Sequence, residues 1–108
     1  MKPLSSKRAK ACAISQKTKK AVYERDNGLC VVCGKRGLPE AHYIPRSHGG
    51  LGIEQNIATL CRRCHYEFDF GTPHNRDAIG YIISCHLKKH YPDWNERDLI
   101  YKKYGGKL

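Results

Sequence analysis

The residues best suited to chemistry in this sequence begin with four cysteines arranged as two close pairs. Cys30 and Cys33 form the first pair, and Cys61 and Cys64 form the second. Two residues separate the thiols of each pair, a spacing that lets both thiols bind one metal ion. Four cysteine thiolates are a tetrahedral ligand set that Zn2+ takes in structural sites, where no coordination position stays open for catalysis. The sequence therefore predicts a structural zinc site.

A redox pair and a disulfide framework are the alternative interpretations of the six cysteines. A thioredoxin-like redox site needs one pair in a βαβ context, whereas this chain has two pairs without that context. A disulfide framework is typical of exported proteins, and the basic segment 1–15 lacks the apolar stretch of a signal peptide. We therefore expect a cytoplasmic, reducing setting, in which Cys12 and Cys85 are free thiols and Cys85 packs within a helix.

A second group of reactive side chains lies between and just after the cysteine pairs. The run 41–50, AHYIPRSHGG, places His42 before a glycine-rich loop, and the run 56–65, NIATLCRRCH, begins with Asn56 and ends with His65. A histidine with a pKa of about 6.5 is partly neutral at pH 7 and can take a proton from water. This role requires a partner, often a backbone carbonyl, that holds the second ring nitrogen.

This order of residues closely resembles the HNH endonucleases, and the resemblance covers about residues 20–70. It implies an α+β fold, in which a small ββα-metal (His-Me finger) core with two zinc knuckles is flanked by an N-terminal helix and C-terminal helices. It also implies that His42 is the general base, that Asn56 positions the loop and this histidine, and that His65 binds the catalytic metal.

The resemblance further implies hydrolysis of DNA phosphodiester bonds with Mg2+ or Mn2+ as the catalytic cofactor. The metal would stabilise the leaving 3′ oxygen, and the products would carry 5′-phosphate and 3′-hydroxyl ends. Arg46, Arg62 and Arg63 flank these residues, so we expect them to bind adjacent phosphates of the DNA.

The sequence departs from the family pattern at Ala41. Many HNH proteins have Asp or His immediately before the base, where that residue helps to hold the metal. In this chain the metal would depend on His65, water and the substrate phosphate, with Glu40 or His48 as a further ligand; otherwise the site would be catalytically weak. Hard cations keep several waters, so one missing ligand does not prevent binding.

Several of these histidines also have a structural interpretation. His42 could be a hydrogen-bonded strand residue, Asn56 could cap the turn before a strand, and His65 could lie beside the zinc knuckle. His86 and His90 have the spacing of a zinc-binding pair on a helix. Two lysines lie between them and would repel a cation, so we expect these two histidines to face solvent.

The chain is long enough for one domain, in which three parts are expected. These are a flexible basic arm over 1–14, a zinc-stapled HNH core over 15–75, and a C-terminal helical extension of the same domain over 76–108. Caps, glycines and hydrophobic spacing predict the elements inside them. The expected elements are a helix from Ser15 to Asn27, strands near 39–45 and 57–60 separated by a loop over 46–55, and helices over 62–70, 76–91 and within 93–103.

The charge of the chain favours nucleic acid as a partner. Twenty Lys and Arg against ten Asp and Glu give a net charge of +10, and the first twenty residues contain no acid. Such an excess attracts polyanions. No apolar run reaches the about 20 residues that a membrane-spanning helix needs, so we expect DNA and no membrane as the partner.

Three functions are compatible with this pattern. The first is a metal-dependent DNA endonuclease with His42 as its base. The second is a zinc-stabilised DNA-binding module without turnover, for which Ala41 would be the marker. The third is an accessory nuclease that works beside a phage or host partner, for example in phage packaging, because the HNH resemblance implies that free-standing proteins of this size are frequent in phages. Cleavage by the isolated chain separates the first function from the other two.

Overall fold

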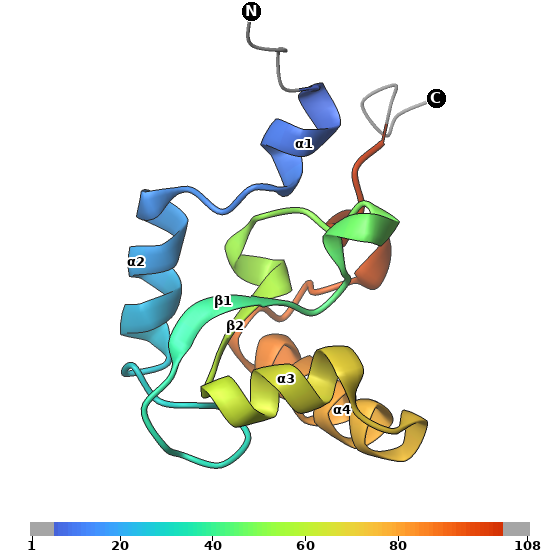
Figure 1. The fold of residues 1–108 in the computed structure, drawn as a ribbon. Coiled ribbons are helices and arrows are strands. Elements are labelled where there is room, and N and C mark those ends of the chain that lie inside the picture. The colour runs from blue at the N-terminus through green and yellow to red at the C-terminus, as the bar shows by residue number, and fades with distance from the viewer. Residues whose placement is uncertain (1–5, 103–108) are drawn as a thin grey trace, which may run out of the picture.

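The computed structural model describes residues 6–102, so residues 1–5 and 103–108, at the outer ends of the predicted arm and extension, lie outside it. Within this range the chain forms helices around one pair of strands (Figure 1). In chain order the elements are α1 (Lys7–Cys12), α2 (Gln16–Arg25), β1 (Leu38–His42), β2 (Ile57–Leu60), α3 (Arg62–Phe70) and α4 (Pro73–His90), with 3-10 helices at Arg46–His48, Glu54–Asn56 and Glu96–Leu99. The α+β class and the predicted ββα order are confirmed.

The two strands form an antiparallel pair whose register brings His42 opposite Ile57 and Ala41 opposite Ala58. The register is irregular between Leu38 and Ala41, so β1 bends along its length. All four residues of β2 are buried, and Cys61 alone separates this strand from α3. The second strand therefore fixes where the second cysteine pair and the helix that follows it must lie.

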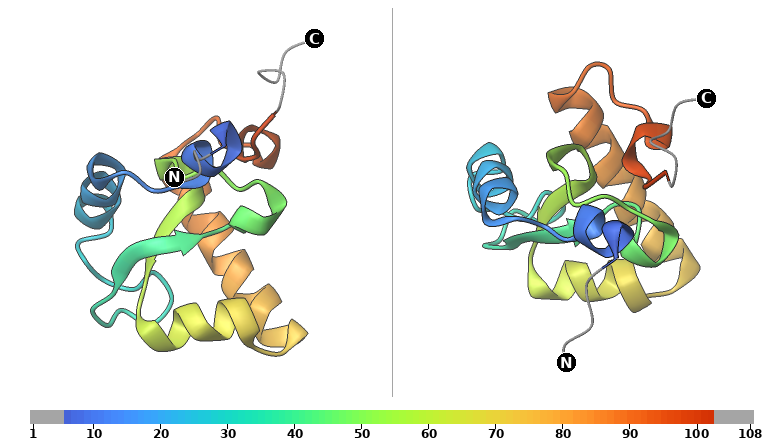
Figure 2. Two further views of the ribbon diagram at one scale, coloured as in Figure 1. Left: turned by 45° about the horizontal axis from the view of Figure 1, so that its top comes forward. Right: turned by 90° about the horizontal axis from the view of Figure 1, so that it is seen from above.

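The core lies between the strands and the side-by-side helices α3 and α4 (Figures 1 and 2). Its members are mainly aliphatic side chains from both strands and one face of α4, together with two of the paired cysteines: Cys30, Ala41, Ala58, Leu60, Cys61, Ile79, Ile83 and Leu87. Burial of this apolar area is the main favourable term in folding. Because the core is small, a metal is expected to add to its stability.

Within the predicted flexible arm, residues 7–12 form helix α1. The Ser6 side chain accepts a hydrogen bond from the Ala9 N–H and caps the helix, and the Cys12 side chain is only 2% exposed. Both views in Figure 2 place α1 beside the loop that follows β1. The prediction of a flexible arm relied on charge and terminal position, which do not reveal whether a segment packs against the rest of its own domain.

Three further expectations are corrected near the C-terminus. The helix expected from residue 76 begins at Pro73, because Thr72 accepts from the Asn75 N–H as an N-cap and proline fits the first helical turn. Cys85 lies on α4 but is exposed rather than packed. The short final helix is a 3-10 helix, Glu96–Leu99.

Within residues 6–102, no helix has the length and apolarity needed to cross a membrane.

His86 does not simply face solvent as predicted, because it contacts a buried carboxylate at the end of α2. Its Nε2 lies 2.7 Å from Asp26 Oδ1. Asp26 also accepts two hydrogen bonds from Arg25 and one from the Thr59 backbone N–H. The hydrogen bonds from Arg25 hold the pKa of Asp26 well below its usual range despite burial. These contacts join α2, β2 and α4.

Candidate active site and zinc centre

The four paired cysteines come together in space. Their sulfur atoms all lie within 4.8 Å of one another, and the Cys33 and Cys61 sulfurs are 3.6 Å apart. A tetrahedral ion with Zn–S bonds of about 2.3 Å has sulfurs about 3.8 Å apart. Both the donor set and its spacing therefore fit one structural zinc ion.

Hydrogen bonds of the backbone around each cysteine pair position these four thiols. In the first zinc knuckle, the turn that carries Cys30 and Cys33, the Gly34 N–H donates to the Cys30 carbonyl. The Val31 N–H donates to the Thr59 carbonyl of β2. In the second knuckle Cys61 caps α3, with its sulfur accepting from the Cys64 N–H at 3.4 Å. That hydrogen bond, together with hydrogen bonds from the neighbouring thiols, lowers the pKa of the Cys61 thiol to about 7, which favours the thiolate that metals bind.

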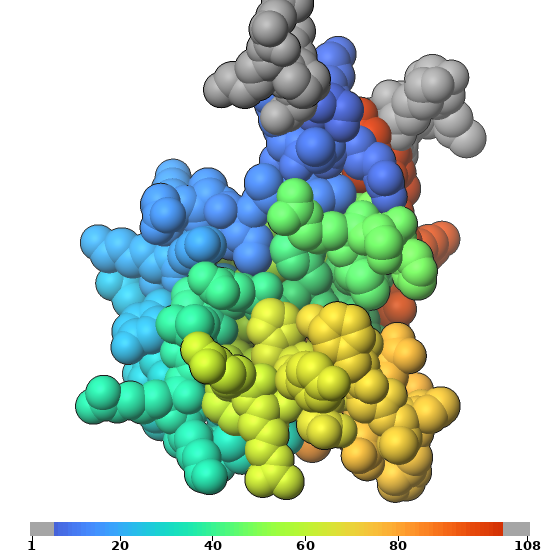
Figure 3. All heavy atoms as spheres, viewed as in Figure 1, coloured from blue at the N-terminus to red at the C-terminus, as the bar shows by residue number. Residues whose placement is uncertain are grey.

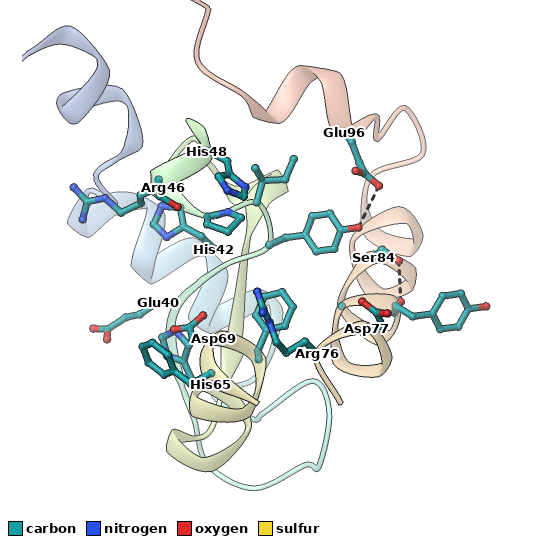
Figure 4. A pocket seen from close by; sticks show the side chains of 18 of the residues that line it. Glu40, His42, Arg46, His48, His65, Asp69, Arg76, Asp77, Ser84 and Glu96 are labelled. Atoms are coloured by element: carbon teal, nitrogen blue, oxygen red, sulfur yellow. Dashed lines mark hydrogen bonds and ion pairs between the residues drawn. The ribbon is translucent and has the colours of Figure 1, made fainter. Parts of the chain in front are cut away.

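An open groove of about 1500 Å³ runs between the loop after β1 and the helices α3 and α4. The side chains that line it include His42 from β1, Arg46 from the loop, His65 and Asp69 from α3, and Arg76 from α4. Figure 4 shows the His42 ring on one side of the groove, with His65 and Asp69 on another. The groove therefore collects two of the three predicted catalytic residues on facing walls.

His42 is half-buried, and its ring is held by a carbonyl. Its Nε2 lies 2.8 Å from the Cys12 backbone oxygen. A carbonyl can only accept, so Nε2 carries the proton and Nδ1 is the free basic nitrogen of the neutral ring. Burial lowers the pKa of His42 below its ordinary value of 6.5, and the charge of Arg46 acts in the same direction. The ring is therefore neutral at pH 7.

Asn56 is fully buried and acts through the backbone. Its side-chain oxygen accepts from the Ile44 N–H at 2.8 Å, and its side-chain nitrogen donates to the carbonyls of Ile44 and Leu51. These three hydrogen bonds tie the two ends of the loop together just after His42. Asn56 is thus a loop-holding residue within the described structure and does not line the groove.

His65 is paired with a carboxylate that sequence reasoning missed. Asp69 lies one helical turn after it, and the two side chains approach within 3.4 Å between Nε2 and Oδ2. The spacing of four residues on a helix could have revealed this pair, because such residues share a face. Two ligands bound at right angles to Mg2+, each about 2.1 Å away, lie about 3 Å apart. The pair therefore suits one hard divalent cation.

Of the remaining candidate residues, Glu40, Arg46 and His48 line the groove, and the other two do not. Arg46 lines the groove, while Arg62 and Arg63 are exposed at the start of α3 and do not line it. Glu40 forms an exposed ion pair with Lys19 at 3.5 Å. His48 lies on the groove wall, but among residues 6–102 no set of three close metal-binding side chains includes it.

The Ala41 side chain is fully buried in the core cluster. An aspartate at this position would place a carboxylate among apolar side chains, a costly arrangement for an unpaired charge. Asp69 is therefore the carboxylate that this chain offers beside His65.

One comparison with known proteins gives a match. Residues 30–67 match the family model described as HNH endonuclease, a span that includes both cysteine pairs, His42, Asn56 and His65. No curated protein matches the chain.

Proposed function

We propose, from the match of residues 30–67 to the HNH endonuclease family model, that this protein is a metal-dependent DNA endonuclease with His42 as its general base. One observation carries the proposal. His42, whose ring is held at Nε2 by the Cys12 carbonyl and so has a free Nδ1, lines the same open groove as the His65–Asp69 pair. A base and a metal-binding pair on facing walls are what hydrolysis of a phosphodiester requires.

His42 supplies the proton transfer. Its Nδ1 takes a proton from a water molecule, and the resulting hydroxide oxygen attacks the phosphorus. The bond from phosphorus to the 3′ oxygen breaks, and that oxygen takes a proton from solvent. The products carry 5′-phosphate and 3′-hydroxyl ends. Burial of the His42 ring supports this role, because it keeps the base neutral at physiological pH.

The pH dependence of cleavage follows from this burial. The neutral base is present at pH 7 and is lost as the pH falls through the lowered pKa of His42. We expect the acid limb of the kcat/KM profile, which reports the free enzyme, to have its midpoint below pH 6.5, the ordinary histidine value. Single-turnover rates measured from pH 4.5 to about 8 test this. An acid limb centred above 6.5 would contradict a buried, neutral base.

His65 and Asp69 are the residues that would hold Mg2+ or Mn2+. When bound, the ion neutralises the negative charge that develops on the phosphate and the leaving oxygen. Arg46 on the groove wall would bind a neighbouring phosphate, while Arg62 and Arg63 would reach phosphates farther along the backbone. Asn56 keeps the loop closed so that His42 and Arg46 stay on one side of the groove.

Metal binding at this pair is testable without any cleavage. We expect Asp69→Asn to weaken Mn2+ binding by at least about tenfold, since the variant removes the charged ligand. Glu67→Gln is the matched control, because Glu67 is a carboxylate on the same helix outside the groove. Calorimetry on the zinc-loaded protein measures both. Equal Mn2+ affinity in Asp69→Asn and wild type would remove Asp69 from the site.

The proposed activity itself is tested on a labelled DNA duplex with Mg2+, Mn2+ or a chelator at matched ionic strength. We expect cleavage with either metal, none with chelator, and nicks that a DNA ligase reseals because their ends are 5′-phosphate and 3′-hydroxyl. A folded, zinc-loaded protein that binds DNA without cutting would point to the second function, a binding module, or to an accessory nuclease that needs its partner.

A further inference from the structure

Helix α1 ends directly against the proposed base. The Cys12 carbonyl at its carboxyl end lies 2.8 Å from His42 Nε2, although thirty positions separate the two residues. We infer that α1 is a positioning element of the active site, which fixes the tautomer and orientation of His42 through this carbonyl. The effect that we expect on turnover rests on the proposed function. The effect that we expect on the His42 ring rests on geometry alone.

The end of α1 is docked by several contacts that do not involve His42. Arg8 donates from Nη2 to the Arg46 and Ser47 carbonyls at 3.3 and 3.1 Å. The Gly52 N–H donates to the Ala11 carbonyl at 2.9 Å. In Figure 3, α1 lies against the loop around residues 46–50. Because these contacts bridge α1 to the loop that follows His42, they determine where the Cys12 carbonyl lies.

Gly52 lies where the loop after β1 passes close to the end of α1. A Cβ atom at this position would lie 2.1 Å from the Ala13 carbonyl oxygen and 3.0 Å from the Cys12 carbonyl oxygen. The first distance is shorter than packed side chains allow, the second is tight, and the obstructing atoms are backbone. The glycine therefore lets the chain after α1 pass close enough for the Cys12 oxygen to reach the imidazole.

The chemical consequence concerns the two ring nitrogens. With Nε2 bound to a carbonyl, the proton is fixed on Nε2 and the lone pair on Nδ1 is available for water. Without that acceptor the neutral ring can place its proton on either nitrogen and can rotate about its side-chain bonds. A fraction of the molecules would then present a protonated Nδ1, which cannot act as a base.

The test uses two variants of the full chain. Gly52→Ala displaces the Cys12 carbonyl, and Arg8→Ala removes the two hydrogen bonds that Arg8 donates to the loop. We expect 15N NMR of the His42 ring to show one tautomer, with the proton on Nε2, in the wild type and a mixture in Gly52→Ala. We also expect kcat on saturating DNA to fall by about 10- to 100-fold in Gly52→Ala, as for loss of a partner that orients a reactive histidine, and by less in Arg8→Ala.

Lys10→Ala is the matched control for Arg8→Ala. It removes the same charge from α1, so any loss of DNA affinity is shared, but Lys10 makes no docking bond among the contacts described for residues 6–102. A lower kcat in Arg8→Ala than in Lys10→Ala supports positioning, whereas equal values indicate a charge effect and overturn it. Zinc content and thermal unfolding show that each variant is folded.

Failure of this inference can be distinguished from failure of the proposed function. A folded Gly52→Ala protein with the His42 proton still fixed on Nε2 would overturn the positioning role, whatever the wild type does to DNA. A wild type that cuts no DNA would contradict the proposed function. In that case the ring measurement alone decides whether α1 positions His42.

Discussion

The His42→Ala variant is expected to cleave DNA about 10²- to 10⁴-fold more slowly than the wild type, the usual contribution of a general base. The loss should appear in kcat, because alanine cannot take the proton from water. DNA affinity should stay within about twofold, because the phosphate contacts come from arginine and lysine side chains. Zinc content should be unchanged, since His42 is not among the clustered cysteine ligands.

Single-turnover kinetics and binding titrations on one duplex separate these two quantities. His74→Ala is the matched control, because His74 is an exposed histidine in the first turn of α4. It should retain wild-type turnover. A His42→Ala protein that cuts at the wild-type rate would reject His42 as the base and would require another proton acceptor on the groove wall.

The Cys61→Ser variant is expected to lose zinc and with it the folded structure. Apparent zinc-binding free energies of about 10–16 kcal/mol at four-ligand sites match or exceed the about 5–15 kcal/mol by which domains are usually stable. Cys61 also caps α3 and is buried in the core cluster. Since α3 carries His65 and Asp69, loss of this cysteine should also disrupt the His65–Asp69 pair that we propose as the catalytic metal site.

Metal analysis and circular dichroism measure the effect of the Cys61→Ser substitution. The wild type should hold one zinc per chain and unfold cooperatively on heating, whereas the variant should hold none and show no cooperative transition. Cys85→Ser is the matched control, because Cys85 is exposed on α4 and lies outside the cluster. It should behave as the wild type. A Cys61→Ser protein that melts near the wild-type temperature would show that the cysteine cluster does not hold the fold together.

Local sequence signals predicted much of the fold. The Ser15 cap placed the start of α2, and β2 and α3 have the expected bounds, 57–60 and 62–70. The cysteine spacing predicted the four-sulfur cluster directly. These predictions succeeded because a helix cap and each close cysteine pair depend on residues a few positions apart, whose side chains meet the backbone that they cap or the ion that they share.

The unpredicted features depend on contacts between remote segments. The Cys12 carbonyl that holds His42 is a backbone group, and a backbone group leaves no mark in residue type. The pairing of His86 with Asp26 joins α4 to the end of α2, so the intervening lysines were a poor guide to its surroundings. Asp69 is different: its position four residues after His65 was visible in the sequence and was overlooked.

The most direct test of the central claim is a supercoiled-plasmid nicking assay with zinc-loaded protein. Wild type and His42→Ala are compared with Mg2+, with Mn2+ and with a chelator of both. We predict open-circular plasmid from the wild type with either metal, and almost none from His42→Ala or in chelator. Equal nicking by the two proteins, or nicking that persists in chelator, would contradict a metal-dependent endonuclease that uses His42 as its base.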